Sequence, residues 1–322
     1  MAIVPDPIVW RDPQESYVHD SELIHRMTPN QTAYTHSFPV HTNSFGLRDR
    51  EFSVVPPPGT VRILCLGDSL TFGAGVGSEE TYPKQLEVLL NSERSGKYEV
   101  INAGVSAYDT WQEVDYLKRE GLRFKPDLVV IGVYANDIVP RPAKIPHVID
   151  RSGSPRRPGL AGFFSDKWIH LLKRSRLLLL LRARFGSLMN RFSPSPEYRH
   201  QTALLNGSAD AFVERGWHEV DRSFRDLSAL SQKYGFRAVL VIFPMADQLM
   251  NRYPKSSYPA QVKLIAEKYR IPFIDMDPVF ERNFRGFGSL FIEWDGHPNA
   301  KAYNLTAREL ARFIQAHSTR LS

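Results

Sequence analysis

The chain has 322 residues, of which 42% are hydrophobic and 24% charged, and its formal net charge is +6. This composition is typical of an ordinary soluble globular protein with one decorated domain or two. The single cysteine, Cys65, excludes an internal disulfide framework and a cysteine metal cluster, and we expect it to be a small buried apolar residue.

The excess of positive charge is local, because it is concentrated between Lys167 and Arg191. No zinc-finger, RNA-recognition or helix-turn-helix signature accompanies it, so we expect no nucleic-acid partner. The start, Met1–Pro7, lacks the basic and apolar regions of a secretory signal, and the apolar run Leu177–Leu181 is far shorter than the roughly 18 residues of a membrane span. We therefore expect a protein that is soluble as written. Its compartment stays open between the cytoplasm and export, the latter if an N-terminal anchor or signal was removed.

Residues 1–60 are rich in proline, histidine and aromatic residues without a clear period and end in Pro56-Pro57-Pro58-Gly59. This composition is typical of loops and short strands, and we expect a small β-rich extension packed on the main domain. The extension contains four histidines whose spacings match no metal site, and we expect them to be structural or exposed: His19, His25, His36 and His41.

From Val61 the pattern alternates between strands and helices. The apolar run Val61–Leu66 predicts a buried strand. The elements expected after it are helix Pro83–Leu90, strand Tyr98–Ala103, helix Thr110–Glu120 and strand Leu128–Val133. Such alternation predicts a parallel sheet covered on both faces.

The pattern breaks over residues 138–215, between the third and fourth strands of this sheet. Proline- and arginine-rich loops lead into Phe163–Phe192, whose leucines and arginines fit one or two amphipathic helices. We expect a helical insertion that caps the substrate site, because loops after strand ends line the site in such folds. Contact between the leucine-arginine segment Trp168–Arg191 and an anionic membrane surface is the alternative, which we favour less.

The alternation resumes toward the end of the chain. The expected elements are helix Val220–Tyr234, strand Arg237–Phe243, helix Gln261–Tyr269, strand Phe273–Met276 and helix Asn299–Ala316. We therefore predict an α/β fold over residues 61–322, a three-layer α/β/α sandwich with a five-stranded parallel sheet.

Four short blocks occur in order along this pattern. Gly67-Asp68-Ser69-Leu70 follows the first strand, Gly104 the second and Asn136-Asp137 the third, and His297 precedes the last helix. Together they resemble the blocks of the SGNH (GDSL-type) hydrolase family, over about residues 60–317. The resemblance implies a flavodoxin-like sheet, a serine esterase activity and no metal or organic cofactor.

Ser69 is the candidate nucleophile, His297 its general base and Asp295 the carboxylate that orients the imidazole. A serine that only caps the following helix would need no distant histidine. The common spacing of the family has the acid three positions before the histidine, where Trp294 stands here, so Asp295 is the nearest acid and Glu293 the alternative.

The resemblance also implies an oxyanion hole, formed by the backbone N–H groups of Ser69 and Gly104 and the side-chain amide of Asn136. Because Gly104 has no side chain, backbone there can approach a substrate closely. Asp68 and Asp137 are expected to brace loops or cap helices.

These residues together predict hydrolysis of a carboxylic ester through an acyl-serine intermediate, on a sugar, lipid or small metabolite. Two alternatives stay open: acyl transfer to a glycan hydroxyl, and a non-catalytic carbohydrate-binding or assembly module on the same fold. The sequence does not determine the acyl chain length, the alcohol or the oligomeric state.

Overall fold

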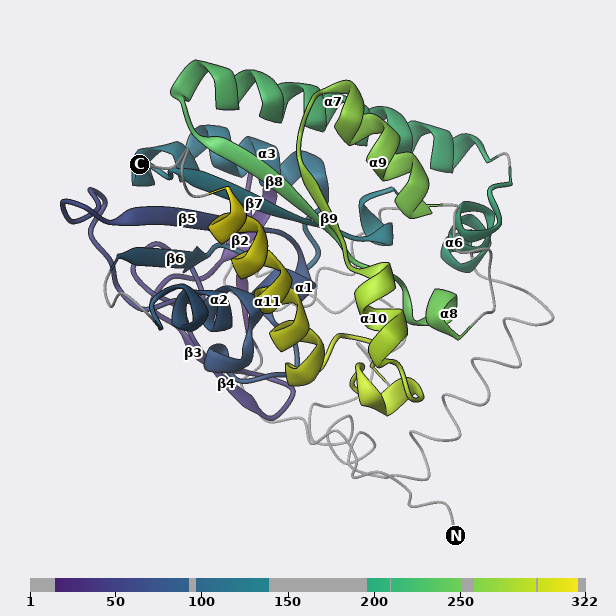
Figure 1. Ribbon diagram of the computed structural model, residues 1–322, viewed down its shortest axis with the longest axis horizontal. Coiled ribbons are helices and arrows are strands. Elements are labelled where there is room, and N and C mark those ends of the chain that lie inside the picture. The colour runs from purple at the N-terminus through teal and green to yellow at the C-terminus, as the bar shows by residue number, and fades with distance from the viewer. Residues whose placement is uncertain are drawn as a thin grey trace, which may run out of the picture.

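A five-stranded parallel sheet forms the centre of the protein, in the order β6-β5-β7-β8-β9 (Figure 1). The computed structural model describes residues 15–92, 97–138, 196–208, 210–250, 258–293 and 295–317. The strands are β5 (Val61–Leu66), β6 (Tyr98–Asn102), β7 (Leu128–Val133), β8 (Arg237–Ile242) and β9 (Phe273–Asp275).

Helices cover both faces of this sheet (Figure 1). One face carries α3 (Thr110–Arg119), α7 (Ala211–Tyr234) and α9 (Tyr258–Lys268). The other carries α2 (Tyr82–Leu90), α10 (Asp277–Asn283) and α11 (Ala300–Ala316). The expected three-layer α/β/α sandwich is therefore confirmed.

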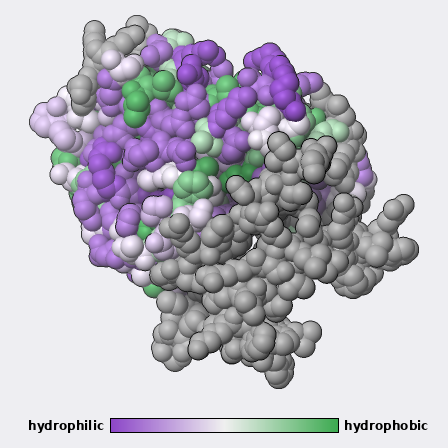
Figure 2. Space-filling model, turned by 90° about the horizontal axis from the view of Figure 1, so that it is seen from below, coloured by the Kyte–Doolittle hydropathy of each residue, from purple (hydrophilic) through white to green (hydrophobic). Residues whose placement is uncertain are grey.

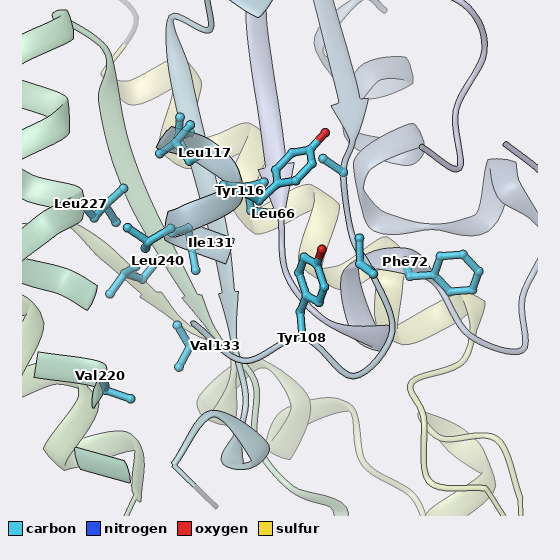
Figure 3. Packing of buried hydrophobic residues seen from close by; sticks show 14 of the residues in the cluster. Leu66, Phe72, Tyr108, Tyr116, Leu117, Ile131, Val133, Val220, Leu227 and Leu240 are labelled. Atoms are coloured by element: carbon cyan, nitrogen blue, oxygen red, sulfur yellow. The ribbon is translucent and has the colours of Figure 1, made fainter. Parts of the chain in front are cut away.

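The two faces have separate apolar cores because side chains alternate along each strand. In β7, Val129 and Ile131 are buried under α3 and α7, whereas Leu128 and Val130 are buried under the opposite layer. Figure 3 shows the first core, where Ile131 and Leu240 of the sheet lie near Leu227 of α7. Residues buried on both faces explain the continuous apolar runs of the strand sequences.

The N-terminal extension contains two antiparallel hairpins. They are β1 (Tyr17–Asp20) with β2 (Ile24–Met27), and β3 (Thr32–Thr35) with β4 (Phe38–His41). Tyr17, Leu23 and Met27 are almost completely buried in the same core as α3, and the Tyr108 hydroxyl donates to the His25 carbonyl at 2.8 Å. The extension is thus part of the packed core on that side of the sheet.

Helix α7 begins nine residues earlier than the expected start at Val220. The Asp210 carboxylate accepts hydrogen bonds from the Phe212 and Val213 N–H groups, which caps the helix at Ala211. In the sequence, Gly216 interrupts the apolar pattern of this helix. In the structure, the Ile138 backbone packs directly against Gly216, because a Cβ on this residue would lie 1.8 Å from the Ile138 carbonyl oxygen. The glycine therefore marks a close helix–backbone contact rather than a helix end.

The remaining described helices comprise α6, of 11 residues, and several single turns. They are α1 (Ser69–Phe72), α6 (Pro196–Asn206), α8 (Ala246–Leu249) and the 3-10 turns η1 (Ser78–Glu80), η2 (Gly121–Phe124), η3 (Ala135–Asp137) and η5 (Phe287–Ser289). Within the range 138–215, the structure describes Ile138, α6 with the turn that follows it, and the start of α7. The expected amphipathic helices over Phe163–Phe192 lie outside the described residues, so the cap remains a prediction.

The described surface shown in Figure 2 is mostly hydrophilic. Exposed large apolar side chains such as Val55, Val88 and Leu264 lie on different elements, as is normal for single surface residues. No helix in the described ranges has both the length and the apolar content needed to cross a membrane.

Candidate active site

The carboxyl edge of the sheet brings three of the expected site residues together. Ser69 follows the inner strand β5, and Gly104 and Asn136 follow its two neighbours, β6 and β7. The chain runs from β5 to β6 on one side and then crosses to β7 on the other side of β5. This reversal of strand order makes the edge the topological switch point where open α/β sheets bind ligands.

Ser69 is the first residue of helix α1. Asp68 caps this helix, because its Oδ1 atom accepts the Leu70 N–H at 2.8 Å. Helix α1 ends after one turn at Gly73, whose φ of 84° is left-handed and suits glycine. The serine is thus held at a helix N-terminus, where its own N–H has no acceptor inside the helix.

The side chains of Ser69, His297 and Asp295 form a continuous line of hydrogen bonds. The Ser69 Oγ atom lies 2.9 Å from His297 Nε2, and His297 Nδ1 contacts Asp295 Oδ1. All three residues are partly buried. An imidazole between a hydroxyl and a carboxylate can take the hydroxyl proton while the carboxylate stabilises the resulting charge.

Asp295 is the acid that contacts the imidazole. Burial by itself raises the pKa of this carboxyl, but hydrogen bonds from His297 and His36 outweigh it and hold the pKa well below its usual range. The carboxylate of Glu293, the alternative acid, lies beside Gly288 instead.

The segment before α11 holds His297 in place. Gly296 has a φ of 93°, the Ile292 N–H donates to the His297 carbonyl at 2.8 Å, and Phe291 pairs with Pro298 as an isolated bridge. This tight turn explains how an acid two positions before the histidine reaches its ring, because the turn folds the carboxylate back on Nδ1. Asn299, two residues after His297, caps α11.

Asn136 lies in the turn η3 and is tied to the nucleophile segment. Its Nδ2 atom donates to Asp68 Oδ2 at 2.8 Å. An amide nitrogen carries two hydrogens, so this bond leaves a second donor available for a substrate oxygen. Asp68 therefore connects the residues after β5 and β7.

Gly104 is in close contact with helix α1. A Cβ at this position would lie 2.2 Å from the Phe72 nitrogen and 2.6 Å from the Thr71 carbonyl carbon. The absence of a side chain thus allows the backbone of α1 to lie against Gly104. From the sequence we expected the glycine to allow the approach of a substrate instead. The Gly104 N–H donates to Asn102 Oδ1 at 3.1 Å, so a substrate oxygen would compete with that acceptor.

Three carboxyl groups near this edge have raised pKa values: Glu113 and Asp137 are buried, and Asp109 is half-buried. Burial, with the charge of Asp68 second, raises the pKa of Asp109 to about 7 and the pKa of Asp137 well above its usual value. Burial and the neighbouring carboxylates also raise the pKa of Glu113 strongly. Asp137 braces its own turn, because Oδ2 accepts the Tyr134 N–H at 2.7 Å.

His36 of the extension also reaches the site, which the sequence interpretation missed. It is buried, and its Nε2 atom lies 3.0 Å from Asp295 Oδ2. The other extension histidines match the expectation: His19 and His41 are exposed, and the buried His25 contacts the Ser106 carbonyl. No local sequence signal marks His36, because its partner is 259 residues away.

Among the residues that the structure describes, no group of three His, Cys, Asp or Glu side chains could hold a metal ion. The thiol of Cys65 lies buried in β5, and burial raises its pKa far above the usual value, so it is an unreactive core residue.

Comparison with known proteins finds similarity to esterases. The chain is 34% identical over 93 residues to an acetylxylan esterase of Xylanibacter ruminicola, a match covering 26% of this chain and 18% of that protein. Among solved structures, the acetyl xylan esterase AlAXEase is 14% identical, with 79% of this chain and 100% of that chain covered and a TM-score of 0.48. The esterase EstA from Pseudoalteromonas sp. is 18% identical, with 80% and 98% covered and a TM-score of 0.46.

The family-level match is much longer than the match to the Xylanibacter ruminicola protein. Residues 65–305, from the end of β5 into α11, fit the model of the GDSL-like lipase/acylhydrolase family. This range contains Ser69, Gly104, Asn136 and His297 in the expected order. The chain belongs to the GDSL-like lipase/acylhydrolase family.

Proposed function

We propose that this protein is a serine esterase that hydrolyses a carboxylic ester through an acyl-Ser69 intermediate. The observation that carries the proposal is the line of hydrogen bonds from Ser69 Oγ through the His297 ring to Asp295. Membership of a family of lipases and acylhydrolases supports an ester as the bond that is broken.

In the acylation step, His297 Nε2 accepts the Ser69 proton as Oγ attacks the ester carbonyl carbon. Asp295 stabilises the imidazolium that forms, and its low pKa keeps it ionised for this role. The imidazolium then donates its proton to the leaving alcohol as the acyl-oxygen bond breaks, which leaves the acyl group on Ser69.

Negative charge develops on the carbonyl oxygen during this attack. The donors proposed for it are the N–H groups of Ser69 and Gly104 and the second Nδ2 hydrogen of Asn136. They follow three adjacent strands at one edge of the sheet. The Gly104 N–H has to exchange Asn102 Oδ1 for the substrate oxygen, whereas the other two donors need little reorganisation during the reaction.

In the deacylation step, His297 removes a proton from the water that attacks the acyl carbon, and it returns this proton to Ser69 Oγ as the acyl-oxygen bond breaks and the acid is released. A glycan hydroxyl could replace the water, since the same acyl-enzyme serves both acceptors. A labelled acyl donor offered together with a glycan separates the outcomes: free labelled acid supports hydrolysis, and labelled glycan supports transfer.

We further propose an acetyl group on a carbohydrate as the substrate. The support is the local identity to an acetylxylan esterase, and the comparison covers only 18% of that protein. A series of p-nitrophenyl esters from acetate to decanoate tests the acyl part, and release of acetate from acetylated xylan tests the alcohol. A preference for long chains would contradict the acetyl proposal and favour a lipid substrate.

The esterase proposal itself is tested by Ser69→Ala. We expect turnover to fall on the order of 10⁶-fold, as for a serine nucleophile within a working triad. A fluorophosphonate probe should label Ser69 in the folded wild type and not in the variant, while Ser78→Ala, in the nearby turn η1, should behave as the wild type. Retained activity in Ser69→Ala, or an unlabelled wild type, would refute the proposal and favour a non-catalytic module.

A further inference from the structure

His36 occupies a strained position at the tip of a hairpin. The register pairs Thr35 with Phe38, so only His36 and Ser37 connect β3 to β4. His36 has a φ of 56°, in the left-handed region that glycine and asparagine adopt most readily. A residue other than glycine or asparagine keeps this backbone conformation only where the surrounding structure holds it. Residues strained in this way concentrate at functional sites.

The imidazole of His36 faces the outer oxygen of Asp295. The distance from Nε2 to Oδ2 is 3.0 Å, and the side chains are only 8% and 15% exposed. The inner oxygen, Oδ1, contacts His297 and accepts the backbone N–H of the same residue at 3.2 Å. The two imidazoles therefore hold opposite oxygens of one carboxylate.

The contacts of His36 Nδ1 are consistent with Nε2 of the same ring donating the hydrogen bond to Asp295. An ionised carboxylate only accepts hydrogen bonds, so the proton between His36 and Asp295 belongs to Nε2. The Nδ1 atom lies 3.5 Å from Thr35 Oγ1, which already accepts the Gly75 N–H at 3.2 Å. The Thr35 hydroxyl hydrogen is then available for Nδ1, which sets the tautomer.

The loop after the nucleophile encloses this ring. A Cβ at Gly75 would lie 3.3 Å from His36 Nδ1 and 2.6 Å from the end of the Ile292 side chain. Gly75 has a φ of 75°, so both its conformation and the space beside it require glycine. The hairpin tip is therefore packed between the segments that carry Ser69 and Asp295.

We propose that His36, supplied by the N-terminal extension, is a positioning residue that fixes Asp295 so that Oδ1 stays directed at His297. The inference rests on the proposed esterase mechanism and assigns a role in it to a segment outside the sheet. Loss of His36 leaves the carboxylate free to rotate, which weakens its support of the imidazolium without altering substrate binding.

His36→Gly tests the proposal, because it removes the ring and relieves the backbone strain. With p-nitrophenyl acetate we expect kcat to fall roughly 10- to 100-fold, the range for one hydrogen bond to a charged group, with KM nearly unchanged. The melting temperature should stay close to that of the wild type. His41→Gln, on the exposed side of the same hairpin, is the matched control and should keep wild-type kcat.

Two further variants decide the matter even if His36→Gly folds poorly. A glutamine amide reaches about as far as Nε2, so His36→Gln should recover most of kcat. His36→Asn tolerates the left-handed backbone but is too short, and it should remain as slow as His36→Gly. Equal activities of the glutamine and asparagine variants would overturn the proposal.

A double-mutant cycle separates positioning from a general effect on the fold. In an Asp295→Ala background, His36→Gln and His36→Asn should have equal rates within about twofold, because His36 then has no carboxylate to hold. If they differ there as much as in the wild-type background, His36 acts elsewhere and the inference is wrong. Failure of the esterase mechanism would appear separately, as activity retained in Ser69→Ala.

Discussion

The Asn136 side chain donates a hydrogen bond of 2.8 Å to the Asp68 carboxylate, although the two residues follow different strands. Asp68 also caps the helix that begins with Ser69. One carboxylate thus links the proposed nucleophile to the proposed oxyanion donor, so that the two cannot move independently. The relationship explains why aspartate stands directly before the serine.

The amide of Asn136 gives the first prediction. Asn136→Ala should lower kcat roughly 10²- to 10³-fold, the usual cost of removing one oxyanion donor, with a much smaller effect on KM. Steady-state kinetics with p-nitrophenyl acetate measure both constants. Asn91→Ala, in the C-cap of α2, is the control. A kcat within a few-fold of the wild type would contradict the role of the amide.

The identity of the acid gives the second prediction. Asp295→Ala should lower kcat on the order of 10⁴-fold, because His297 loses the carboxylate on Nδ1. Glu293→Gln should have kcat within a few-fold of the wild type, because this carboxylate lies beside Gly288. The reverse order of the two variants would identify Glu293 as the acid.

Gly104 gives a prediction about stability. In Gly104→Ala the new Cβ would meet backbone atoms of α1 at 2.2 to 2.6 Å, so the free energy of unfolding should fall by about 1 to 3 kcal/mol. Urea denaturation measures this change, and kcat should fall with it because Ser69 lies on α1. In Gly77→Ala, the nearest atom is the end of the Glu80 side chain at 3.2 Å. That control should lose much less stability than Gly104→Ala.

Asp109 gives a prediction about pH. Its pKa in the folded protein is about 7, raised by burial and by the charge of Asp68, against about 4 in the unfolded chain. The folded state therefore binds more protons between these values, and this group lowers stability as pH rises from about 4 to 7. Asp109 is the N-cap of α3, a position that asparagine fills equally well. Asp109→Asn should therefore be more stable than the wild type above pH 7, on the order of 1 to 4 kcal/mol.

The difference between Asp109→Asn and the wild type should become small as pH falls to about 4, where the wild-type carboxyl is protonated in the folded state and about half protonated in the unfolded chain. Asp210, the cap of α7, is the control of opposite sign, because a hydrogen bond from His200 lowers its pKa. Asp210→Asn should therefore lose stability relative to the wild type at neutral pH. Melting temperatures measured from pH 4 to 9 check both variants, and a pH-independent effect of Asp109→Asn would contradict the assignment.

Arg48 gives a prediction about the extension. Its buried guanidinium donates to the carbonyls of Phe72, the last residue of α1, and of Gly73 and Val76 in the chain that follows. Arg48→Met leaves these acceptors without their donor and should lower the free energy of unfolding by roughly 3 kcal/mol. Arg50→Met, at an exposed ion pair with Glu87, should cost less than about 1 kcal/mol. Similar losses in both variants would show that the buried contacts contribute little.

Local sequence patterns were sufficient to predict the architecture. Strands β5 and β7 have the expected ends, and β6, β8, β9 and the helices α2, α3, α9 and α11 lie within a few residues of the predicted ranges. Helix α7 begins nine residues earlier than expected, and α10 was not predicted. Buried parallel strands are continuous apolar runs, and turn residues separate them from helices of regular period. Pairing at the sheet then placed the residues after β5, β6 and β7 at one edge, as the order of the blocks predicted.

The prediction failed where a residue's role depends on contacts with distant residues. Gly216 interrupts the pattern of α7, and only the Ile138 carbonyl packed against it explains why the helix continues. Likewise, spacing alone left Asp295 and Glu293 as alternatives, and the turn through Gly296 determines which carboxylate meets His297.

The sequence by itself determined the fold class and the candidate nucleophile and base, because periodicity and short motifs are local properties of the chain. Only the tertiary structure decided which acid contacts the imidazole, and that His36 of the extension contacts the same acid from its other side. Such contacts join segments hundreds of residues apart. Their geometry results from the packing of whole elements, and no local pattern of residues records it.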